Sequence, residues 1–249
     1  MDLIRFSLNR ILFIDIETVS SSHRYSDLSS IEQELWEEKR GRYRAEGIDP
    51  ADYYFNNAGI FAEFGKIICI SLGYFSKQEE KRVFKVKSIS DHDEAKLLND
   101  FVQVLNQFEK SFGNQLVICG HNVREFDLPY ICRRLVVHGM ISNFPPFFMK
   151  IQMAKPWELT SMILDTLDTW RFGDYKNYIS LKLYTHVLGI PSPKDDIDGS
   201  EVGKVYYEDN DLNRIRIYCE KDVVSVAAII LKLKGMPPIN SDEIIISSE

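Results

Sequence analysis

This chain of 249 residues lacks the features that mark several classes of protein. It has no run near the roughly 20 apolar residues that a membrane span needs. Its first residues do not pair a basic stretch with a long apolar one, so no signal peptide is predicted. The chain has four cysteines, at Cys69, Cys119, Cys132 and Cys219. They have no C-x-x-C spacing, and three of the four lie in apolar stretches. We therefore expect reduced core thiols in a cytoplasmic protein without disulfides, a zinc site or membrane contact.

An excess of basic residues is also missing. The chain has 30 Lys and Arg against 37 Asp and Glu, a net charge of −7. This balance disfavours a protein that coats nucleic acid by bulk electrostatics. It is compatible with an enzyme that grips a few nucleotides, because bound divalent cations change the local charge where phosphates approach. Apolar residues make up 45% and charged residues 27%, so the chain can build a sizeable core.

Apolar periodicity and turn signals predict a mixed α/β domain. Strands are expected at 11–18, 66–75, 82–89 and 116–119, with a strand or turn near 162–166. Helices are expected at 91–112, 126–138, 180–188 and 211–234. The first helix would begin with a capping box of Asp91 and Glu94 and end at Gly113. Prolines make 140–160 irregular, and 239–249 form a tail that could add an edge strand at 244–246.

The first functional motif is a pair of acids on the most apolar predicted strand. Asp15 and Glu17 are two residues apart, so both side chains project from the same face of that strand. The neighbouring residues are apolar on both faces, as in a central strand, where buried acids need partners. A half-exposed strand with an acidic outer face is the alternative for this pair taken alone. Adjacent carboxylates repel unless a cation lies between them, and Mg²⁺ prefers such oxygen ligands.

Two later motifs add further acids. Gly120 to Asp127 follows an apolar strand and leads into a helix, where Asp127 alone could act only as a partner of the helix dipole. In the last helix Tyr218 and Asp222 are four residues apart, so a phenol and a carboxylate share one face. The alternative there is a core tyrosine with an incidental surface acid. For Asp165, a place near the site and a place on the surface are equally compatible with the pattern.

Together, the three motifs resemble those of DEDD-type 3′→5′ exonucleases in content and order: Asp15-x-Glu17, Asn122-x-x-x-Phe126-Asp127 and Tyr218-x-x-x-Asp222. The tyrosine resembles the DEDDy branch, because the branch with histidine would need that residue where Ile217 stands. Residues 65–71 and 193–200 are similar to stand-alone bacterial exonucleases related to the proofreading domain of family-B DNA polymerases. The resemblance covers most of residues 10–235. It implies a ribonuclease-H-like fold with a five-stranded mixed sheet flanked by helices.

The same resemblance implies roles for the motif residues. Four carboxylates would hold two divalent ions, Mg²⁺ or Mn²⁺, about 3.5–4 Å apart. Asp15 would bridge both ions. Glu17 and Asp222 would complete the shell of the ion that activates water, and Asp127 would hold the other. Tyr218 would orient the attacking water, because a phenol with a pKa near 10 is a poor general base.

Contacts with substrate are predicted at two further places. Asn122 would contact the substrate or support the second motif, and Phe126 would pack on the terminal nucleotide or fill the core. Residues 19–60 form an insertion too long for a hairpin turn. Its basic residues lie near aromatic ones and could hold a single strand by phosphate contact and stacking: Arg40, Arg42 and Arg44. A helix with its charges sorted along the dipole explains the same residues equally well.

We expect one exonuclease domain over residues 1–238, followed by the tail. The leading interpretation is a metal-dependent enzyme that releases 5′-mononucleotides from the 3′ end of single-stranded or frayed DNA. No polymerase domain fits in the chain, so any repair role would be in trans. Trimming of RNA 3′ ends, as in ribonuclease-D-like enzymes, is an alternative, because a metal site contacts the phosphate and does not distinguish the sugar of RNA from that of DNA. A catalytically silent nucleic-acid-binding module is disfavoured, because unpaired buried acids would cost stability.

Overall fold

A six-stranded mixed sheet forms the centre of the molecule in a computed structural model, which describes residues 6–42, 47–79, 81–191 and 196–247. The strands are β1 (Ile11–Ser20), β2 (Gly65–Gln78), β3 (Lys81–Ser90), β4 (Val117–Gly120), β5 (Ile163–Asp165) and β6 (Ile244–Ser247). Their order across the sheet is β5-β4-β1-β2-β3-β6. β1, β2 and β3 pair antiparallel, whereas β4, β5 and β6 each pair parallel with a neighbour.

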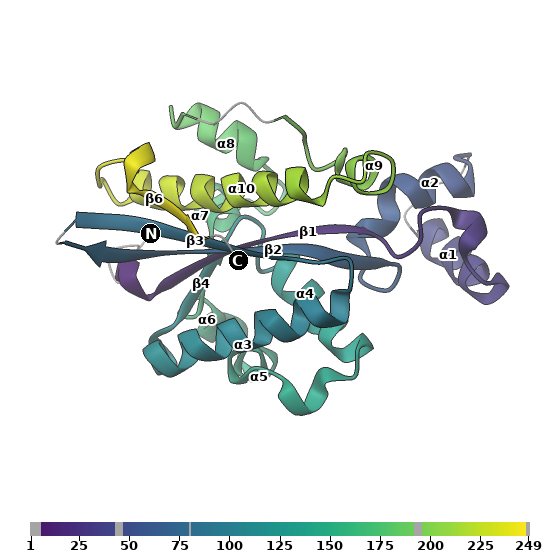
Figure 1. The fold of residues 1–249 in the computed structure, drawn as a ribbon, viewed down its shortest axis with the longest axis horizontal. Coiled ribbons are helices and arrows are strands. Elements are labelled where there is room, and N and C mark those ends of the chain that lie inside the picture. The colour runs from purple at the N-terminus through teal and green to yellow at the C-terminus, as the bar shows by residue number, and fades with distance from the viewer. Residues whose placement is uncertain (1–5, 43–46, 80, 192–195, 248–249) are drawn as a thin grey trace.

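Helices cover both faces of this sheet (Figure 1). One layer holds α7 (Thr166–Arg171), α8 (Leu181–Val187), α9 (Val202–Tyr207) and α10 (Leu212–Leu233). The other holds α3 (Glu94–Phe112), α4 (Asp127–Val137), α5 (Pro146–Met153) and α6 (Pro156–Leu159). No helix in the described part of the chain is long and apolar enough to cross a membrane.

Alternation along β1 decides which helical layer each of its side chains meets. Leu12, Ile14 and Ile16 join the buried cluster formed with α3, α4 and α5. Ile11 and Phe13 join the buried cluster formed with α10. Because strand side chains alternate, Asp15 and Glu17 share the parity of Phe13 and face the layer that contains α10.

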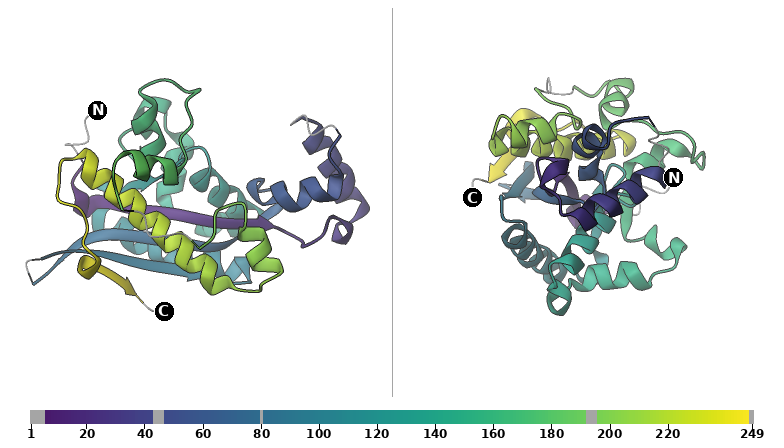
Figure 2. Two further views of the ribbon diagram at one scale, coloured as in Figure 1. Left: turned by 90° about the horizontal axis from the view of Figure 1, so that it is seen from above. Right: turned by 90° about the vertical axis from the view of Figure 1, so that its right-hand side faces the viewer.

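The insertion at 19–60 forms a small helical lobe beyond the end of the sheet (Figure 2). It contains α1 (Ser30–Arg42) and α2 (Pro50–Asn57). Trp36 is fully buried in the lobe and packs edge-on against Tyr54 at 5.2 Å and Phe64 at 5.1 Å between ring centroids. The aromatic residues of the insertion therefore supply a local core, which is a structural use for much of its composition.

Three expectations about the elements are wrong. α3 is capped by Asp93, whose Oδ1 accepts from the backbone N–H groups of Ala95 (2.9 Å) and Lys96 (3.2 Å), and not by Asp91 with Glu94. The reason is that Glu94 points into the core. The second wrong expectation is that residues 140–160 are irregular. They contain α5 and α6, because a proline at the first position of a helix needs no N–H there.

The third error is the number of strands. The tail adds β6, which pairs with β3 from Phe84↔Ile244 onward, so the sheet has six strands and not five. Arg82 on β3 holds this segment by donating to the carbonyls of Pro237 (3.1 Å) and Pro238 (2.7 Å). The other expected strands and the helices ending at Gly113 and beginning after Asp211 are present, with boundaries shifted by a few residues.

Candidate active site

Acids from three remote stretches of the chain meet beside β1. Asp127 at the start of α4 is tied to this strand, because its Oδ1 accepts a hydrogen bond of 3.1 Å from the backbone N–H of Ile16. Asp222 on α10 and Asp127 both raise the pKa of Asp15 well above its usual value, after burial, which is the largest cause. The first, second and third acidic motifs are therefore assembled at one place by the fold.

In this cluster, burial and the charges of neighbouring acids are the main causes that raise the pKa of each buried acid. Burial raises the pKa of Glu17, and the charges of Asp15 and Asp222 raise it further. Burial also raises the pKa of Asp127 to about 7, opposed by backbone hydrogen bonds and reinforced by Asp165 and Asp222. Concentrated negative charge of this kind favours either bound protons or a bound cation.

The acids open onto a cleft of about 490 Å³. Its walls come from β1, the loop after β4, the start of α8, the 197–199 turn and α10: Asp15, Ile16, His121, Asn122, Phe126, Asp127, Tyr178, Ser180, Leu181, Lys182, Thr185, Ile197, Asp198, Gly199, Tyr218, Asp222 and Ser225. Both Tyr218 and Asp222 reach this cleft, so α10 presents a phenol and a carboxylate to it from one helical face. Glu17, 8% exposed, is not among the lining residues.

A buried thiol adjoins the carboxylates. Cys219 Sγ donates to Asp15 Oδ2 at 3.3 Å and contacts the Asp15 carbonyl oxygen at 3.4 Å. Ligand atoms of Asp15, Glu17 and Cys219 all lie within 4.8 Å of one another. Burial raises the pKa of the Cys219 thiol, which keeps it protonated and able to donate. The sequence pattern indicated only a core thiol here, and its position between Tyr218 and Asp222 was the available signal.

Asp165 holds the second motif in place. It ends β5, which is parallel to β4, and its carboxylate accepts from the backbone N–H groups of Asn122 (2.9 Å) and Arg124 (3.0 Å). Asn122 has a left-handed backbone with φ of +63°, a conformation that few residues other than glycine adopt. Asp165 is 5% exposed, so the structure places it beside the site and not on the surface.

His121 braces the same loop. Its Nε2 donates to the carbonyl of Ile179 at 2.8 Å, and its Nδ1 lies 2.9 Å from Thr166 Oγ1. Burial lowers the pKa of the imidazole. Both ring nitrogens are occupied by the protein, which assigns His121 a positioning role at the cleft wall.

The predicted substrate contacts have different positions. Asn122 and Phe126 line the cleft, and Phe126 also packs on Tyr130 with ring centroids 5.4 Å apart. Arg40 lies in the helical lobe, where it pairs with Glu37 at 2.7 Å and donates to the Ile48 carbonyl at 3.0 Å. Arg42 is the last residue of α1, and Arg44 falls outside the described residues. Arg40 is not among the cleft-lining residues, so contact between the lobe and a substrate stays a prediction.

Comparison with protein families identifies a match over most of the chain. The model of a family described as "predicted 3′-5′ exonuclease related to the exonuclease domain of PolB" matches residues 60–239. The matched region contains Asp127, Tyr218 and Asp222, whereas Asp15 and Glu17 precede it. No curated protein matches the chain.

Proposed function

The chain belongs to the family of predicted 3′-5′ exonucleases related to the exonuclease domain of PolB, and from that premise we propose a metal-dependent exonuclease of the DEDDy type. It removes 5′-mononucleotides from the 3′ end of single-stranded or frayed DNA. The observation that carries this proposal is the gathering of acids from β1, α4 and α10 at one cleft, where they raise one another's pKa values. The relation to a DNA polymerase domain supports DNA as the substrate.

The donor set fits hard divalent cations such as Mg²⁺ or Mn²⁺. Asp15, Glu17, Asp127 and Asp222 offer carboxylate oxygens, and those of Asp15 and Glu17 lie within 4.8 Å of each other. Buried acids that are surrounded by acids are stabilised when cations neutralise them. Such ions, when bound, supply Lewis-acid polarisation of the phosphodiester and a water that ionises at neutral pH.

The protein's own residues position the reactants. β1 holds Asp15 and Glu17 in the middle of the sheet, and the Ile16 N–H fixes the orientation of Asp127. Tyr218, one turn before Asp222, orients the attacking water by a hydrogen bond in this proposal. Phe126, which also lines the cleft, packs against the terminal nucleotide in this proposal. A near-attack geometry of this kind contributes to the rate because the reactants lose little further freedom.

The test is cleavage of 5′-end-labelled DNA and RNA oligonucleotides in Mg²⁺ or Mn²⁺. The expected result is a ladder of DNA products shortened stepwise from the 3′ end, with release of 5′-mononucleotides. Chelation by EDTA and the substitution Asp222→Asn should each abolish the ladder. The matched control is Asp52→Asn, the same chemical change at an exposed position of α2.

Two outcomes would contradict the proposal. Binding of single strands without cleavage in either metal would indicate a silent binding module. Cleavage confined to RNA would indicate a 3′-end trimming enzyme and would refute the assignment of DNA as substrate.

A further inference from the structure

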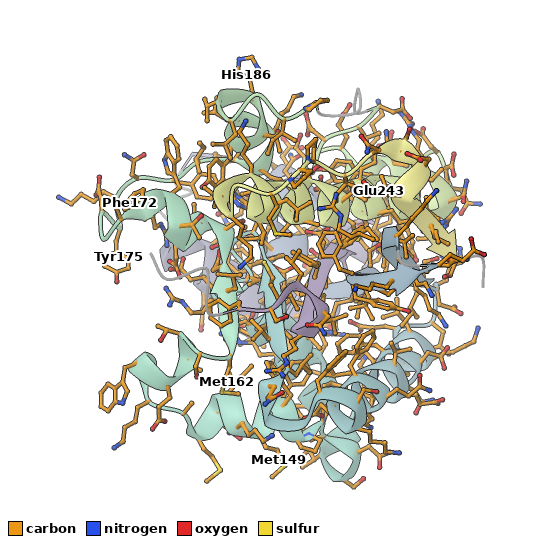
Figure 3. All side chains as sticks on the ribbon, turned by 90° about the vertical axis from the view of Figure 1, so that its left-hand side faces the viewer. Met149, Met162, Phe172, Tyr175, His186 and Glu243 are labelled. Carbon is orange, nitrogen blue, oxygen red and sulfur yellow. The ribbon has the colours of Figure 1, made fainter. Side chains whose placement is uncertain are left out.

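One loop beside the cleft carries three strongly exposed aromatic side chains. Phe172, Tyr175 and Tyr178 are 82%, 72% and 64% exposed. In the described part of the chain, the other large aromatic side chain that is strongly exposed is Trp157 on α6, at 68%. Phe172 and Tyr175 lie at the periphery on the same side of the molecule (Figure 3). Aromatic side chains are normally buried to a large extent, so three exposed rings in one short loop indicate a binding surface.

The loop is anchored to the active site at both ends. Arg171, immediately before it, pairs through Nη1 with Glu125 Oε1 at 3.0 Å. Ile179, immediately after it, accepts the hydrogen bond from His121 Nε2. Glu125 and His121 belong to the segment that carries the second acidic motif. The aromatic residues are therefore held beside the carboxylates by contacts at each end of the loop.

The loop also continues directly into the cleft. Tyr178 lines the cleft together with Asp15, Asp127 and Asp222. A polymer whose end reaches the carboxylates from this side meets Tyr178, and Tyr175 and Phe172 belong to the same loop. This continuity favours a polymeric substrate as the occupant of the loop, over a partner protein bound elsewhere.

Positive charge accompanies the rings. Lys176 lies within the loop and is exposed, and Lys182 lines the cleft at the start of α8. Lys182 acts on Asp198 across the cleft, where it lowers the pKa of that acid after the hydrogen bonds from Ser200 have done so. Asp174 is also in the loop, and its Oδ1 accepts from the backbone N–H of Lys176 at 3.1 Å. Aromatic rings with nearby lysines are the combination that holds bases and phosphates of an unpaired strand.

We propose that the loop from Phe172 to Tyr178, here called the aromatic loop, stacks the bases of single-stranded nucleic acid next to the 3′-terminal nucleotide. This inference rests on the proposed function and specifies its substrate as an unpaired strand. Stacking requires an exposed face of each base, which a duplex does not offer. The aromatic loop thus selects single-stranded or frayed ends, while the carboxylates perform the cleavage.

The experiment measures the affinity for a fluorescein-labelled single-stranded DNA of about eight nucleotides, a length within the usual range of single-strand sites. Fluorescence anisotropy is recorded with Mg²⁺ in the Asp222→Asn background, so that no cleavage occurs. Tyr178→Ala should weaken binding about tenfold, and the triple alanine variant of the aromatic loop by about a hundredfold or more. Tyr175→Phe and Tyr178→Phe keep the rings and should retain the parent affinity.

Two controls separate stacking from general surface effects. Trp157→Ala removes an equally exposed ring from α6 and should leave the affinity unchanged. Lys176→Ala removes one phosphate contact and should lower the slope of log K against log salt by about 0.7, whereas the aromatic variants should leave this slope unchanged. Thermal melting of each variant checks that the fold is retained.

Failure of this inference differs from failure of the proposed function. If the parent enzyme cleaves DNA but the alanine variants bind as tightly as the parent, the aromatic loop does not bind substrate. If the alanine variants also weaken the binding of a blunt duplex by the same factor, the inference is overturned, because the bases of a duplex are not available for stacking. If the parent protein neither binds nor cleaves any single strand, the proposed function itself fails.

Discussion

Two clusters of ionisable side chains, one around Glu94 and one formed by the acids of the cleft, differ in what surrounds their carboxylates. Glu94 on α3 is 5% exposed, close to the 8% of Glu17 and the 4% of Asp127. Glu94 accepts from the backbone N–H of Ile67 at 2.7 Å, from Arg134 Nε at 2.9 Å and from His138 Nε2 at 2.7 Å. Its carboxylate is therefore satisfied by the chain itself.

The carboxylates of the cleft are arranged in the opposite way. Besides burial, the strongest influences that raise the pKa of Asp15 are Asp222 and Asp127, which are also acids. Burial of a charge is costly unless a partner compensates it. The comparison teaches that burial alone does not identify a functional acid. An acid whose hydrogen bonds are all supplied by the chain stabilises the fold, whereas a group of acids that repel one another favours bound protons or a bound cation.

The largest expected effect is a loss of cleavage on substitution in the cleft cluster, with no loss of stability. Asp222→Asn should lower kcat/KM for single-stranded DNA by a factor of about 10³ or more, because the variant loses a carboxylate that we propose binds metal. The free energy of unfolding without metal should stay the same or increase, since one repelling charge is removed. Rate measurements and urea denaturation of the same preparation test both parts. Retained cleavage, or a large loss of stability, would contradict the assignment.

The reverse pattern is expected for the structural cluster. Glu94→Ala leaves Arg134 buried without this carboxylate and should lower the free energy of unfolding by about 3–5 kcal/mol. Urea denaturation measures this loss, and Glu94→Gln, which keeps an acceptor for the Ile67 N–H, should cost less. The kcat of the fraction that remains folded should be close to that of the parent. A stability loss under about 1 kcal/mol would show that the ion pair is not structurally important.

Removal of the Tyr218 hydroxyl tests the role of this residue in the cleavage step. Tyr218→Phe keeps the ring but loses the hydroxyl, so cleavage should slow by about 10²-fold. The affinity for single strands and the stabilisation by Mn²⁺ should not change, because the hydroxyl is assigned to the attacking water. Single-turnover rates and thermal shifts with Mn²⁺ measure the two effects. An unchanged rate would remove Tyr218 from the mechanism.

The smallest effect concerns pH. The pKa of Asp127 is raised from 3.8 to about 7 in the folded protein. Between these values the folded state binds more protons than the unfolded state, so the stability of the metal-free protein should fall as pH rises through this window. Thermal melting in EDTA should show a decrease of a few degrees between about pH 5 and pH 8.

A metal should reverse this trend. Mn²⁺ should raise the melting temperature more at high pH than at low pH, because its ligands must be ionised to bind it. Asp127→Asn should flatten the metal-free pH dependence, and no comparable flattening is expected from Asp52→Asn. Equal stabilisation by Mn²⁺ at both pH values would contradict the assignment of these acids as ligands.

Local pattern predicted much of the fold. The apolar stretch at 11–18 and the periodic stretch at 211–234 correspond to β1 and α10, and Asp211 is the N-cap of α10. The prolines at 140–160 misled, because Pro146 and Pro156 begin helices and do not interrupt them. The tail was expected to add an edge strand at 244–246, and β6 forms there, but the resemblance implied five strands and the pattern did not say which strand β6 would pair with. Its four residues pair with β3, and Arg82 holds the segment just before them at Pro237, and neither long-range contact is encoded in the local sequence.

The site divides in a similar way. The motifs picked out five residues, of which Asp15, Asp127, Tyr218 and Asp222 line one cleft and Glu17 does not. The pattern left the position of Asp165 open and indicated only a core thiol at Cys219, because their importance lies in hydrogen bonds to the Asn122 backbone and to Asp15. The aromatic loop carried no motif either. Exposure of its rings depends on how Arg171 and Ile179 are attached to residues about 50 positions earlier, at 3.0 Å and 2.8 Å.

The order of residues by itself determined that Asp15 and Glu17 share one strand face and that Tyr218 and Asp222 share one helix face. These relations follow from covalent geometry and the periods of strand and helix, and they span only a few bonds. Only the tertiary structure decided that both faces look into the same cleft. Packing of α10 and α4 against β1 brings together charges that are more than 100 residues apart in the sequence. Helix and strand periodicity relate only residues that are close in the sequence, so they do not predict this contact.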